Sequence, residues 1–154
     1  KGSWAGAMGQ SQFMPSSFLS YAVDWDGDGK RDIWGTKPDV FASTAYYLLK
    51  AGWRDDITWG RKVTLPNGFS MDGKNTKALA DGKIRAKLPV WAEAGVRNTD
   101  GGALPAKDLT ARLVIPAGSD GPAFLVYSNF DSILDWNRSN YYALAIGHLS
   151  DKLR

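Results

Sequence analysis

The sequence contains no cysteine, one histidine and one glutamate among its 154 residues. Without cysteine it can form no disulfide, no zinc–thiolate site and no thiol nucleophile. The single histidine, His148, excludes most histidine-based metal sites and serine–histidine triads. Fifteen of the 16 acidic residues are aspartates, so a mechanism with a glutamate acid needs Glu93 or a glutamate outside these residues.

The sequence also lacks any run of 18 apolar residues, so we expect no membrane span. Its 19 basic and 16 acidic residues give a net charge of +3 without a basic cluster. That charge does not predict a nucleic-acid partner, although it suits an anionic polymer. Lys1 opens a glycine- and alanine-rich stretch without an initiator methionine, signal peptide or tag. We therefore expect a piece of a longer protein.

The two ends of the chain have helical patterns. Pro15, followed by two serines, predicts a short helix over about 16–22. Pro38 and Asp39 open the clearest helix, which Gly52 ends. Residues 131–136 and 141–153 are also helical in pattern. We predict that residues 1–54 and 130–154 form one helical body.

The middle of the chain, residues 55–129, is rich in turn signals and short β-type runs. Strands are predicted at 61–65, 109–115 and 124–127, with turns at 66–68, 72–73, 100–102 and 116–118. Apolar residues on one face of the second strand indicate that it is half-buried: Leu109, Ala111, Leu113 and Ile115. A short helix is predicted over 89–94. The fold class is therefore α+β, a helical core with a small β-rich insertion.

Residues 24–32, DWDGDGKRD, have the spacing of an EF-hand-like calcium loop. Aspartates at positions 1, 3 and 5 would supply carboxylates, position 7 a backbone carbonyl and position 9 another carboxylate. Because four aspartates this close repel each other without a cation, we predict one structural Ca²⁺. The ligands at these positions are Asp24, Asp26, Asp28, Lys30 and Asp32.

The end of this loop departs from the usual pattern. Position 12, normally a bidentate glutamate, is Gly35, and Asp39 is the nearest carboxylate that could close the site instead. A solvated Asp/Gly turn is the alternative interpretation. The loop occurs once, whereas dockerin modules use it in duplicate, which argues against a dockerin.

Three further features are weaker candidates. Glu93 beside Trp91 has the setting of an acid with a raised pKa, but a solvent-facing residue on a short helix is favoured. His148 is interpreted as a helix-surface or capping residue. Most of the seven tryptophans are expected in the core, while the segment 136–142, WNRSNYY, combines aromatic faces with amides and hydroxyls as sugar sites do.

Residues 2–17, GSWAGAMGQSQFMPSS, resemble the signature of the membrane-bound lytic transglycosylase B family. The similarity continues through residues 21–24 into the acidic loop, and then through 32–34, 47–48 and 52–53. It resumes at 121–127, 129–130, 136–139 and 142–145. Ordered blocks at both ends make the resemblance specific, and the middle of the chain matches more loosely.

The resemblance implies a goose-type-lysozyme-like core with one calcium ion, in a periplasmic enzyme that is either free or anchored to the outer membrane by a lipid. The partner it implies is the peptidoglycan glycan strand. Such an enzyme cleaves the MurNAc–GlcNAc β-1,4 bond without water, and one glutamate serves first as acid and then as base while a 1,6-anhydro ring closes. In the family this glutamate precedes the GSWAGAMG segment, so we expect the catalytic acid upstream of Lys1.

The resemblance also implies a set of saccharide-binding positions. Ser3 matches the family serine that faces the catalytic glutamate, and tryptophan stands at position 136 where relatives can carry tyrosine. Met8 and Phe13 are expected to pack in the cleft floor. The expected substrate-binding residues are Ser3, Gln12, Tyr47, Trp136, Asn137 and Tyr142. A calcium-stabilised carbohydrate-binding module that was never catalytic is the alternative function.

Overall fold

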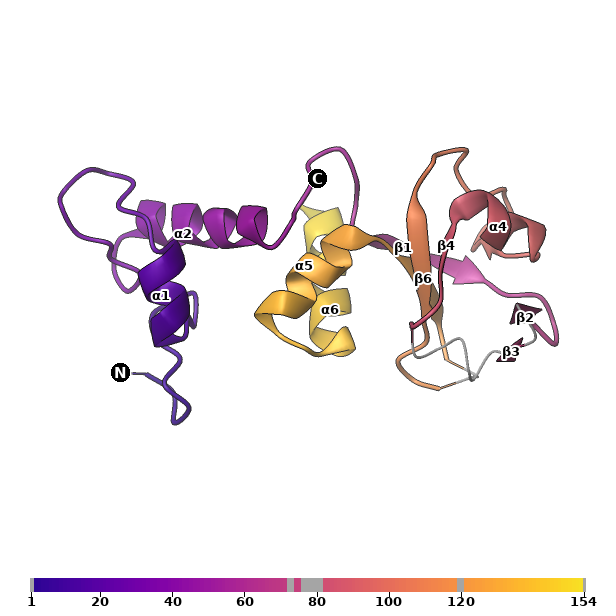
Figure 1. Cartoon of the computed structure of the whole chain (residues 1–154), viewed down its shortest axis with the longest axis horizontal. Helices are drawn as coiled ribbons and strands as arrows, with labels where there is room; N and C mark the ends of the chain where they lie inside the picture. The colour runs from indigo at the N-terminus through magenta and orange to yellow at the C-terminus, as the bar shows by residue number, and fades with distance from the viewer. Residues whose placement is uncertain (1, 72–73, 76–81, 119–120, 154) are drawn as a thin grey trace. The chain divides into compact units, whose positions relative to one another are not determined.

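The computed structural model describes residues 2–71, 74–75, 82–118 and 121–153 (Figure 1). The turn predicted at 72–73 lies outside these residues. The chain forms two compact units, Lys1–Trp53 and Arg54–Arg154, called here the N-terminal and C-terminal units. The expected division into 1–54 with 130–154 and an insertion at 55–129 stays a prediction.

The N-terminal unit contains two helices, α1 (Pro15–Tyr21) and α2 (Lys37–Lys50). Each begins with a proline in its first turn, where no backbone donor is needed. Gly52 ends α2 because it adopts a left-handed backbone with φ of 90°. The structure confirms both predicted helices within one or two residues.

A tight hairpin precedes α1. The backbones of Met8 and Phe13 exchange two hydrogen bonds, with N···O distances of 2.9 and 3.0 Å. Gln12 closes this hairpin with φ of 51°, a left-handed conformation that no other non-glycine residue adopts within the described part of the chain. Phe13 is buried and Met8 is half-buried, and their expected place in the floor of a cleft stays a prediction.

The C-terminal unit is built on an antiparallel sheet with strand order β4-β6-β7-β1-β5. The three predicted strands appear as β1 (Gly60–Thr64), β6 (Thr110–Val114) and β7 (Ala123–Val126). The edge strands β4 (Arg85–Lys87) and β5 (Arg97–Asn98), and the hairpin β2 (Ser70–Met71) and β3 (Lys74–Asn75), were not predicted. They are too short to show periodicity.

The main hydrophobic core lies between this sheet and helix α4 (Leu88–Glu93). Trp91 is fully buried and stacks on Phe69, and its indole N–H donates to the backbone carbonyls of Ala86 and Ala111. The core also contains Val63, Val96, Leu113, Ile115 and Leu125. The predicted short helix is therefore what closes one face of the sheet.

Both faces of β6 are buried, so the half-buried interpretation of this strand is wrong. Arg112 and Val114, on the face expected to be exposed, are 7% and 1% exposed. Arg112 binds Asp131 through two nitrogens and lies over the ring of Phe130, both in helix α5 (Ser128–Trp136). A charged side chain at this position is buried because the carboxylate neutralises it.

Helix α6 (Asn140–Lys152) packs beside α5 and against Trp59. A Cβ atom on Gly147 would overlap the Trp59 indole, whose N–H donates to Asp151 over 2.9 Å. Only two of the seven tryptophans, Trp59 and Trp91, are buried, so the expectation that most lie in the core is wrong. Among the described residues, no helix combines the length and hydropathy needed to cross a bilayer.

Candidate functional site

The acidic loop brings three carboxylates together. One oxygen from each of Asp24, Asp26 and Asp28 lies within 4.8 Å of the other two. Gly27 and Gly29 adopt left-handed backbones, with φ of 77° and 86°, which lets the chain turn twice within five residues. Hard oxygen donors at this spacing fit a calcium ion.

Backbone amides hold these carboxylates in place. Asp24 accepts from the N–H groups of Gly27 and Gly29 at 2.8 and 2.9 Å. Asp28 accepts from the N–H of Lys30 at 2.8 Å. Asp28 and Lys30 are exposed to solvent. The loop is therefore shaped by its own aspartates, and one ion added there would be in contact with solvent.

Asp39 and Asp32 lie outside the cluster of three aspartates, and their carboxylates accept from backbone N–H groups at the two ends of the loop. Asp39 is fully buried in the first turn of α2, and it accepts from the N–H groups of Trp25 and Asp32 at 2.8 and 2.9 Å. Asp39 thus clamps the beginning of the loop to its end. The role of both residues as calcium ligands stays a prediction.

Asp32 caps the segment that leads into α2. Its carboxylate accepts from the N–H groups of Trp34 and Gly35 at 2.8 and 3.0 Å and from the hydroxyl of Thr36. These donors, first of all the N–H of Trp34, lower the pKa of Asp32. The carboxylate is therefore kept in its charged form.

Ser3 and Gln12 lie in the segment before α1, and both are exposed. The Ser3 hydroxyl accepts from the N–H of Ala7 at 3.0 Å, which holds the turn ahead of the hairpin. The Gln12 amide donates to the carbonyl of Gly9 at 2.9 Å, across the hairpin. These contacts leave the Ser3 hydroxyl hydrogen and the Gln12 amide oxygen available to a ligand.

The hairpin is attached to the end of the acidic loop through Gln10. The Gln10 backbone N–H donates to the carbonyl of Ile33 at 2.8 Å, and its side-chain amide donates to the carbonyl of Trp34 at 2.7 Å. Gly9 lies against Ile33 with no room for a Cβ atom. The segment carrying Ser3 and Gln12 is therefore fixed to the segment carrying Asp32.

Tyr47 belongs to an aromatic cluster within the same unit. Its ring lies 5.8 Å from that of Phe13 and 5.0 Å from that of Tyr21. Tyr47 is half-buried, so one side of the ring packs while the rest stays accessible. The hairpin and α2 thus place Tyr47 next to the residue that follows Gln12.

The remaining expected sugar-binding residues gather where α5 meets α6, in the C-terminal unit. Trp136 is the last residue of α5, and Asn137, which is exposed, caps it. Ser139 caps α6 by accepting from the N–H of Tyr142 at 3.3 Å. The structure therefore places three of the six expected residues in each unit, and their assembly into one cleft stays a prediction.

The two weaker candidates of the sequence, Glu93 and His148, are surface residues. Glu93 is exposed on α4. His148 is exposed on α6, with its ring edge-on to Trp59 at 5.1 Å and Phe124 at 5.7 Å. Both positions agree with the interpretation favoured from the sequence.

Comparison with known proteins decides the family. Residues 1–151 match the transglycosylase SLT domain. The chain belongs to this transglycosylase family.

Three relatives illustrate the similarity. The chain is 34% identical to the membrane-bound lytic murein transglycosylase B of Escherichia coli, over 97% of this chain and 38% of that protein. SltB3 of Pseudomonas aeruginosa, solved in complex with NAG-anhNAM-pentapeptide, is 51% identical, with a TM-score of 0.91 over 99% of this chain and 40% of that chain. Escherichia coli Slt35, solved in complex with calcium, is 32% identical, with a TM-score of 0.72 over 98% of this chain and 45% of that chain.

These matches confirm the resemblance seen in the sequence and the mixed α+β, lysozyme-like class of the fold. The chain spans about 40% of the length of two of these relatives, the Escherichia coli enzyme and SltB3. The activity of the whole protein is therefore a matter for proposal.

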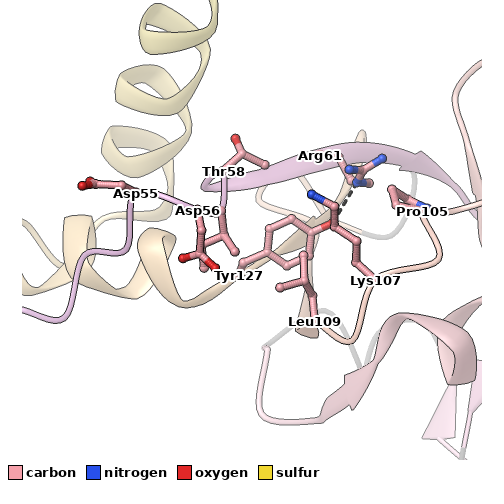
Figure 2. Close-up of a pocket in the computed structure, with 9 residues that line it drawn as sticks. Asp55, Asp56, Thr58, Arg61, Pro105, Lys107, Leu109 and Tyr127 are labelled. Atoms are coloured by element: carbon pink, nitrogen blue, oxygen red, sulfur yellow. Dashed lines mark hydrogen bonds between the residues drawn. The ribbon is translucent and has the colours of Figure 1, made fainter.

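The transglycosylase domain also has a pocket that the sequence did not indicate. It has a volume of about 360 Å³ and lies in the C-terminal unit between the start of β1, the end of β7 and the segment 105–109 (Figure 2). Arg61 donates through Nε to the Tyr127 hydroxyl at 2.8 Å and through Nη1 to the Asn98 side chain at 3.1 Å. These residues are far apart in sequence, so no local motif marks them.

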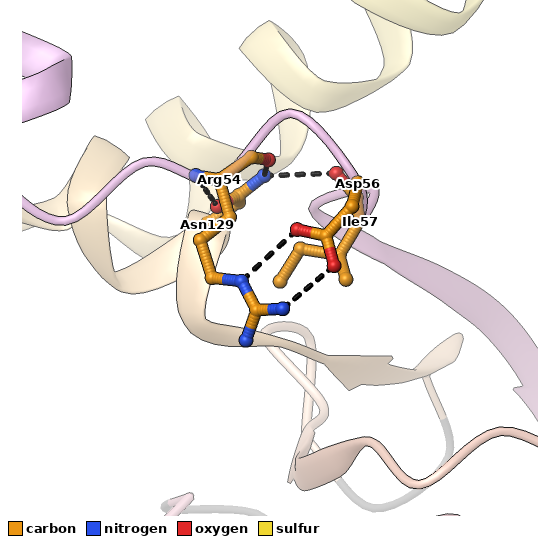
Figure 3. A network of polar contacts seen from close by, with 4 residues as sticks. All are labelled: Arg54, Asp56, Ile57 and Asn129. Carbon is orange, nitrogen blue, oxygen red and sulfur yellow. Dashed lines mark hydrogen bonds and ion pairs between the residues drawn. The ribbon is translucent and has the colours of Figure 1, made fainter.

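Asn129, the second residue of α5, holds one wall of this pocket. Its side-chain oxygen accepts from the N–H of Arg54 at 2.9 Å, and its nitrogen donates to the carbonyls of Arg54 and Ile57 at 2.7 and 2.9 Å (Figure 3). Arg54 in turn binds Asp56 through two nitrogens. The polar side chain of Asn129 is fully buried, so these contacts replace the water that it lost.

Proposed function

We propose that this chain is part of a lytic murein transglycosylase that cleaves the MurNAc–GlcNAc β-1,4 bond of peptidoglycan and forms 1,6-anhydro-MurNAc. The observation that carries the proposal is the family match over residues 1–151 together with the likeness to SltB3. SltB3 was solved with NAG-anhNAM-pentapeptide, and we assign the same class of glycan to this protein.

The proposed chemistry needs one carboxylic acid. The acid protonates the glycosidic oxygen as the bond breaks, and the resulting carboxylate then takes the proton of the MurNAc C6 hydroxyl as that oxygen attacks C1. No water and no second carboxylate nucleophile enter, unlike the usual glycosidase reactions. The residues around the sugar have only to bind it and orient the C6 hydroxyl.

We place this acid outside the 154 residues. Glu93 is exposed on α4, in the other unit from Ser3. Asp131 is paired with Arg85 and Arg112, and Asp39 is buried among backbone donors. The shifted carboxyl pKa values among the described residues, at Asp32 and Asp56, are both lowered, which is the opposite of what a proton donor needs.

The saccharide-binding roles follow the matched positions. Ser3 and Gln12 would offer a hydroxyl and an amide, Tyr47 and Trp136 aromatic faces, and Asn137 and Tyr142 further polar groups. The left-handed backbone of Gln12 supports this assignment because strained backbones persist chiefly where function requires them. The exposed side chains of Ser3, Gln12 and Asn137 are accessible to a glycan.

We further propose that the acidic loop holds one structural Ca²⁺ in an EF-hand-like manner. Asp24, Asp26 and Asp28 would bind it directly, with the Lys30 carbonyl, Asp32 and Asp39 completing or supporting the site. The grouped carboxylates and the calcium complex of Slt35 support this proposal. The ion would neutralise clustered negative charge, and Asp39 and Gln10 connect the loop to α2 and the hairpin.

The substrate class implies a location in the bacterial envelope. We propose that the whole protein acts in the periplasm on glycan strands, either freely or with a lipid anchor at the outer membrane. The relatives include a membrane-bound murein transglycosylase, which supports this location.

Mass spectrometry of digested sacculi tests the activity. We expect no 1,6-anhydro-muropeptides from the 154-residue chain, and their release by a chain extended upstream to include the family glutamate. Anhydro products from the 154 residues alone, abolished by Glu93→Gln, would show that the acid is Glu93. If the extended chain binds glycan strands but releases nothing, the non-catalytic binding module is the correct function.

A further inference from the structure

We propose that the pocket between Arg61, Lys107 and Tyr127 binds the free carboxylate of a short peptide or amino acid. This pocket uses none of the residues proposed to contact the glycan, so the inference goes beyond the proposed function. It rests on three side chains at the pocket, each with a donor hydrogen that has no acceptor among the described residues.

Tyr127 supplies the first donor. Its side chain is 1% exposed, and its phenolic oxygen accepts from Arg61 Nε at 2.8 Å. Within the described part of the chain, no group accepts the hydroxyl hydrogen. Burial raises the pKa of Tyr127, so the group remains a proton donor throughout the neutral range. A buried hydroxyl with an unused hydrogen beside a pocket favours an anionic acceptor there.

Arg61 and Lys107 supply the other donors. Tyr127 and Asn98 fix two of the Arg61 nitrogens, which leaves Nη2 without an acceptor in the described residues. The Lys107 ammonium donates no hydrogen bond to the described residues, although its charge helps to lower the pKa of Asp56, and its side chain is exposed. Figure 2 shows Arg61, Lys107 and Tyr127 gathered at one end of the pocket and Asp55 at the other. A guanidinium held in one orientation is suited to a planar carboxylate.

The acidic residues of the pocket narrow the ligand class. Asp56 is held by Arg54, with N···O distances of 3.0 and 2.6 Å, and so does not neutralise Arg61. Figure 2 shows the Asp55 carboxylate pointing away from Arg61 and Lys107, so it does not neutralise them either. A carboxylate on the ligand would balance these positive charges.

The volume of the pocket and its apolar lining residues agree with a peptide end or an amino acid as the ligand. The volume of about 360 Å³ is at the small end of the range for small-molecule sites, about 300–1,000 Å³. Ile57, Pro105 and Leu109 supply apolar surface for a small side chain. The pocket therefore suits the end of a peptide, whereas a glycan strand would need a longer groove.

Titration of the 154-residue chain with dialanine, followed by NMR at the Arg61 Nε–H and by calorimetry, tests the proposal. We expect saturable binding of dialanine and none of dialanine amide, which has the same shape without the carboxylate. Alanine, tested in parallel, distinguishes a free amino acid from a peptide end as the source of the carboxylate. Equal binding of the acid and the amide, or no saturable binding of any carboxylate, would overturn the proposal.

Variants locate the site. Tyr127→Phe removes one hydroxyl and keeps the ring, and Lys107→Gln removes an exposed charge, so both are expected to fold. Each should weaken dialanine binding by about tenfold, the usual loss for a hydrogen bond to a charged group. Lys62→Gln, an exposed residue next to Arg61 on β1, is the matched control and should bind as before. Unchanged affinity in both pocket variants would also overturn the proposal.

The outcome is independent of the proposed function. Release of anhydro-muropeptides by the upstream-extended chain depends on the side chains proposed to bind the glycan and on the catalytic glutamate expected upstream of Lys1. Dialanine binding depends on the pocket. Either measurement can fail while the other succeeds.

Discussion

The backbone N–H of Gln10 donates to the carbonyl oxygen of Ile33 over 2.8 Å, and this bond joins the N-terminal hairpin to the end of the acidic loop. Next to it, Gly9 has φ of 70°, and a Cβ atom there would lie 2.7 Å from the same carbonyl oxygen. The hairpin can therefore approach the loop only because position 9 is glycine. The positions of Ser3 and Gln12, which we propose to bind the glycan, depend on that approach.

Gly9→Ala should destabilise the chain more than a glycine replacement in open space. Gly52 also has a left-handed backbone, but a Cβ atom added there would meet nothing within 4 Å, so Gly52→Ala is the matched control. Both variants carry the backbone penalty, and only Gly9→Ala adds overpacking, at about 1–3 kcal/mol. Urea unfolding followed by circular dichroism measures the difference. Equal losses would show that the hairpin is not fixed to Ile33.

Gln12→Gly and Gln12→Ala separate the strain of this residue from its function. Glycine adopts the left-handed backbone freely, so Gln12→Gly should be more stable than Gln12→Ala by about 1 kcal/mol. Both variants lack the amide and should bind glycan fragments equally poorly. Wild-type affinity in either variant, measured by calorimetry, would contradict a role for Gln12 in binding.

Calcium should raise the melting temperature, because the ion would bind the folded loop and not the unfolded chain. EGTA should reverse the effect, and Asp28→Ala should remove most of it. Asp100→Ala is the control, since Asp100 also accepts a backbone N–H in an exposed turn but lies in the C-terminal unit. A melting curve that is the same with calcium and with EGTA would count against the site.

Asn129→Ala should be among the most destabilising single replacements in the C-terminal unit. It removes three hydrogen bonds and leaves the N–H and carbonyl of Arg54 and the buried carbonyl of Ile57 without their Asn129 partner. The expected loss in the free energy of unfolding is about 3 kcal/mol. Asn67→Ala, in an exposed turn, should change it by less than about 0.5 kcal/mol. A small effect of Asn129→Ala would mean that water replaces these contacts.

Stability should fall at alkaline pH partly through Tyr127. Burial raises the pKa of this phenol above its ordinary value of 10.0, although Arg61 opposes the shift. A folded-state pKa above the unfolded one means that the contribution to stability is complete below pH 10.0 and is lost as the pH rises through the higher folded pKa. Tyr127→Phe should flatten this dependence and remove one tyrosinate absorbance step from the alkaline titration. An unchanged ultraviolet titration would contradict the shift.

The sequence by itself determined the helices, the central strands and the family. Proline at the start of α1 and α2, glycine after α2 and α4, and the spacing of the aspartates in 24–32 are local signals that need no tertiary contact to be read. The ordered blocks of family residues were equally visible. Edge strands of two or three residues were missed because they are too short for a periodicity.

Only the tertiary structure decided which polar and aromatic residues are buried. The alternating pattern of its strand predicts that Arg112 is exposed. Arg112 is instead buried, because Asp131, nineteen positions later, neutralises its charge. Asn129 contacts Arg54 across a separation of 75 residues, and Tyr127 contacts Arg61 across 66. Burial of a charge or an amide depends on a partner brought close by the fold, so the local pattern of a strand or helix cannot reveal it.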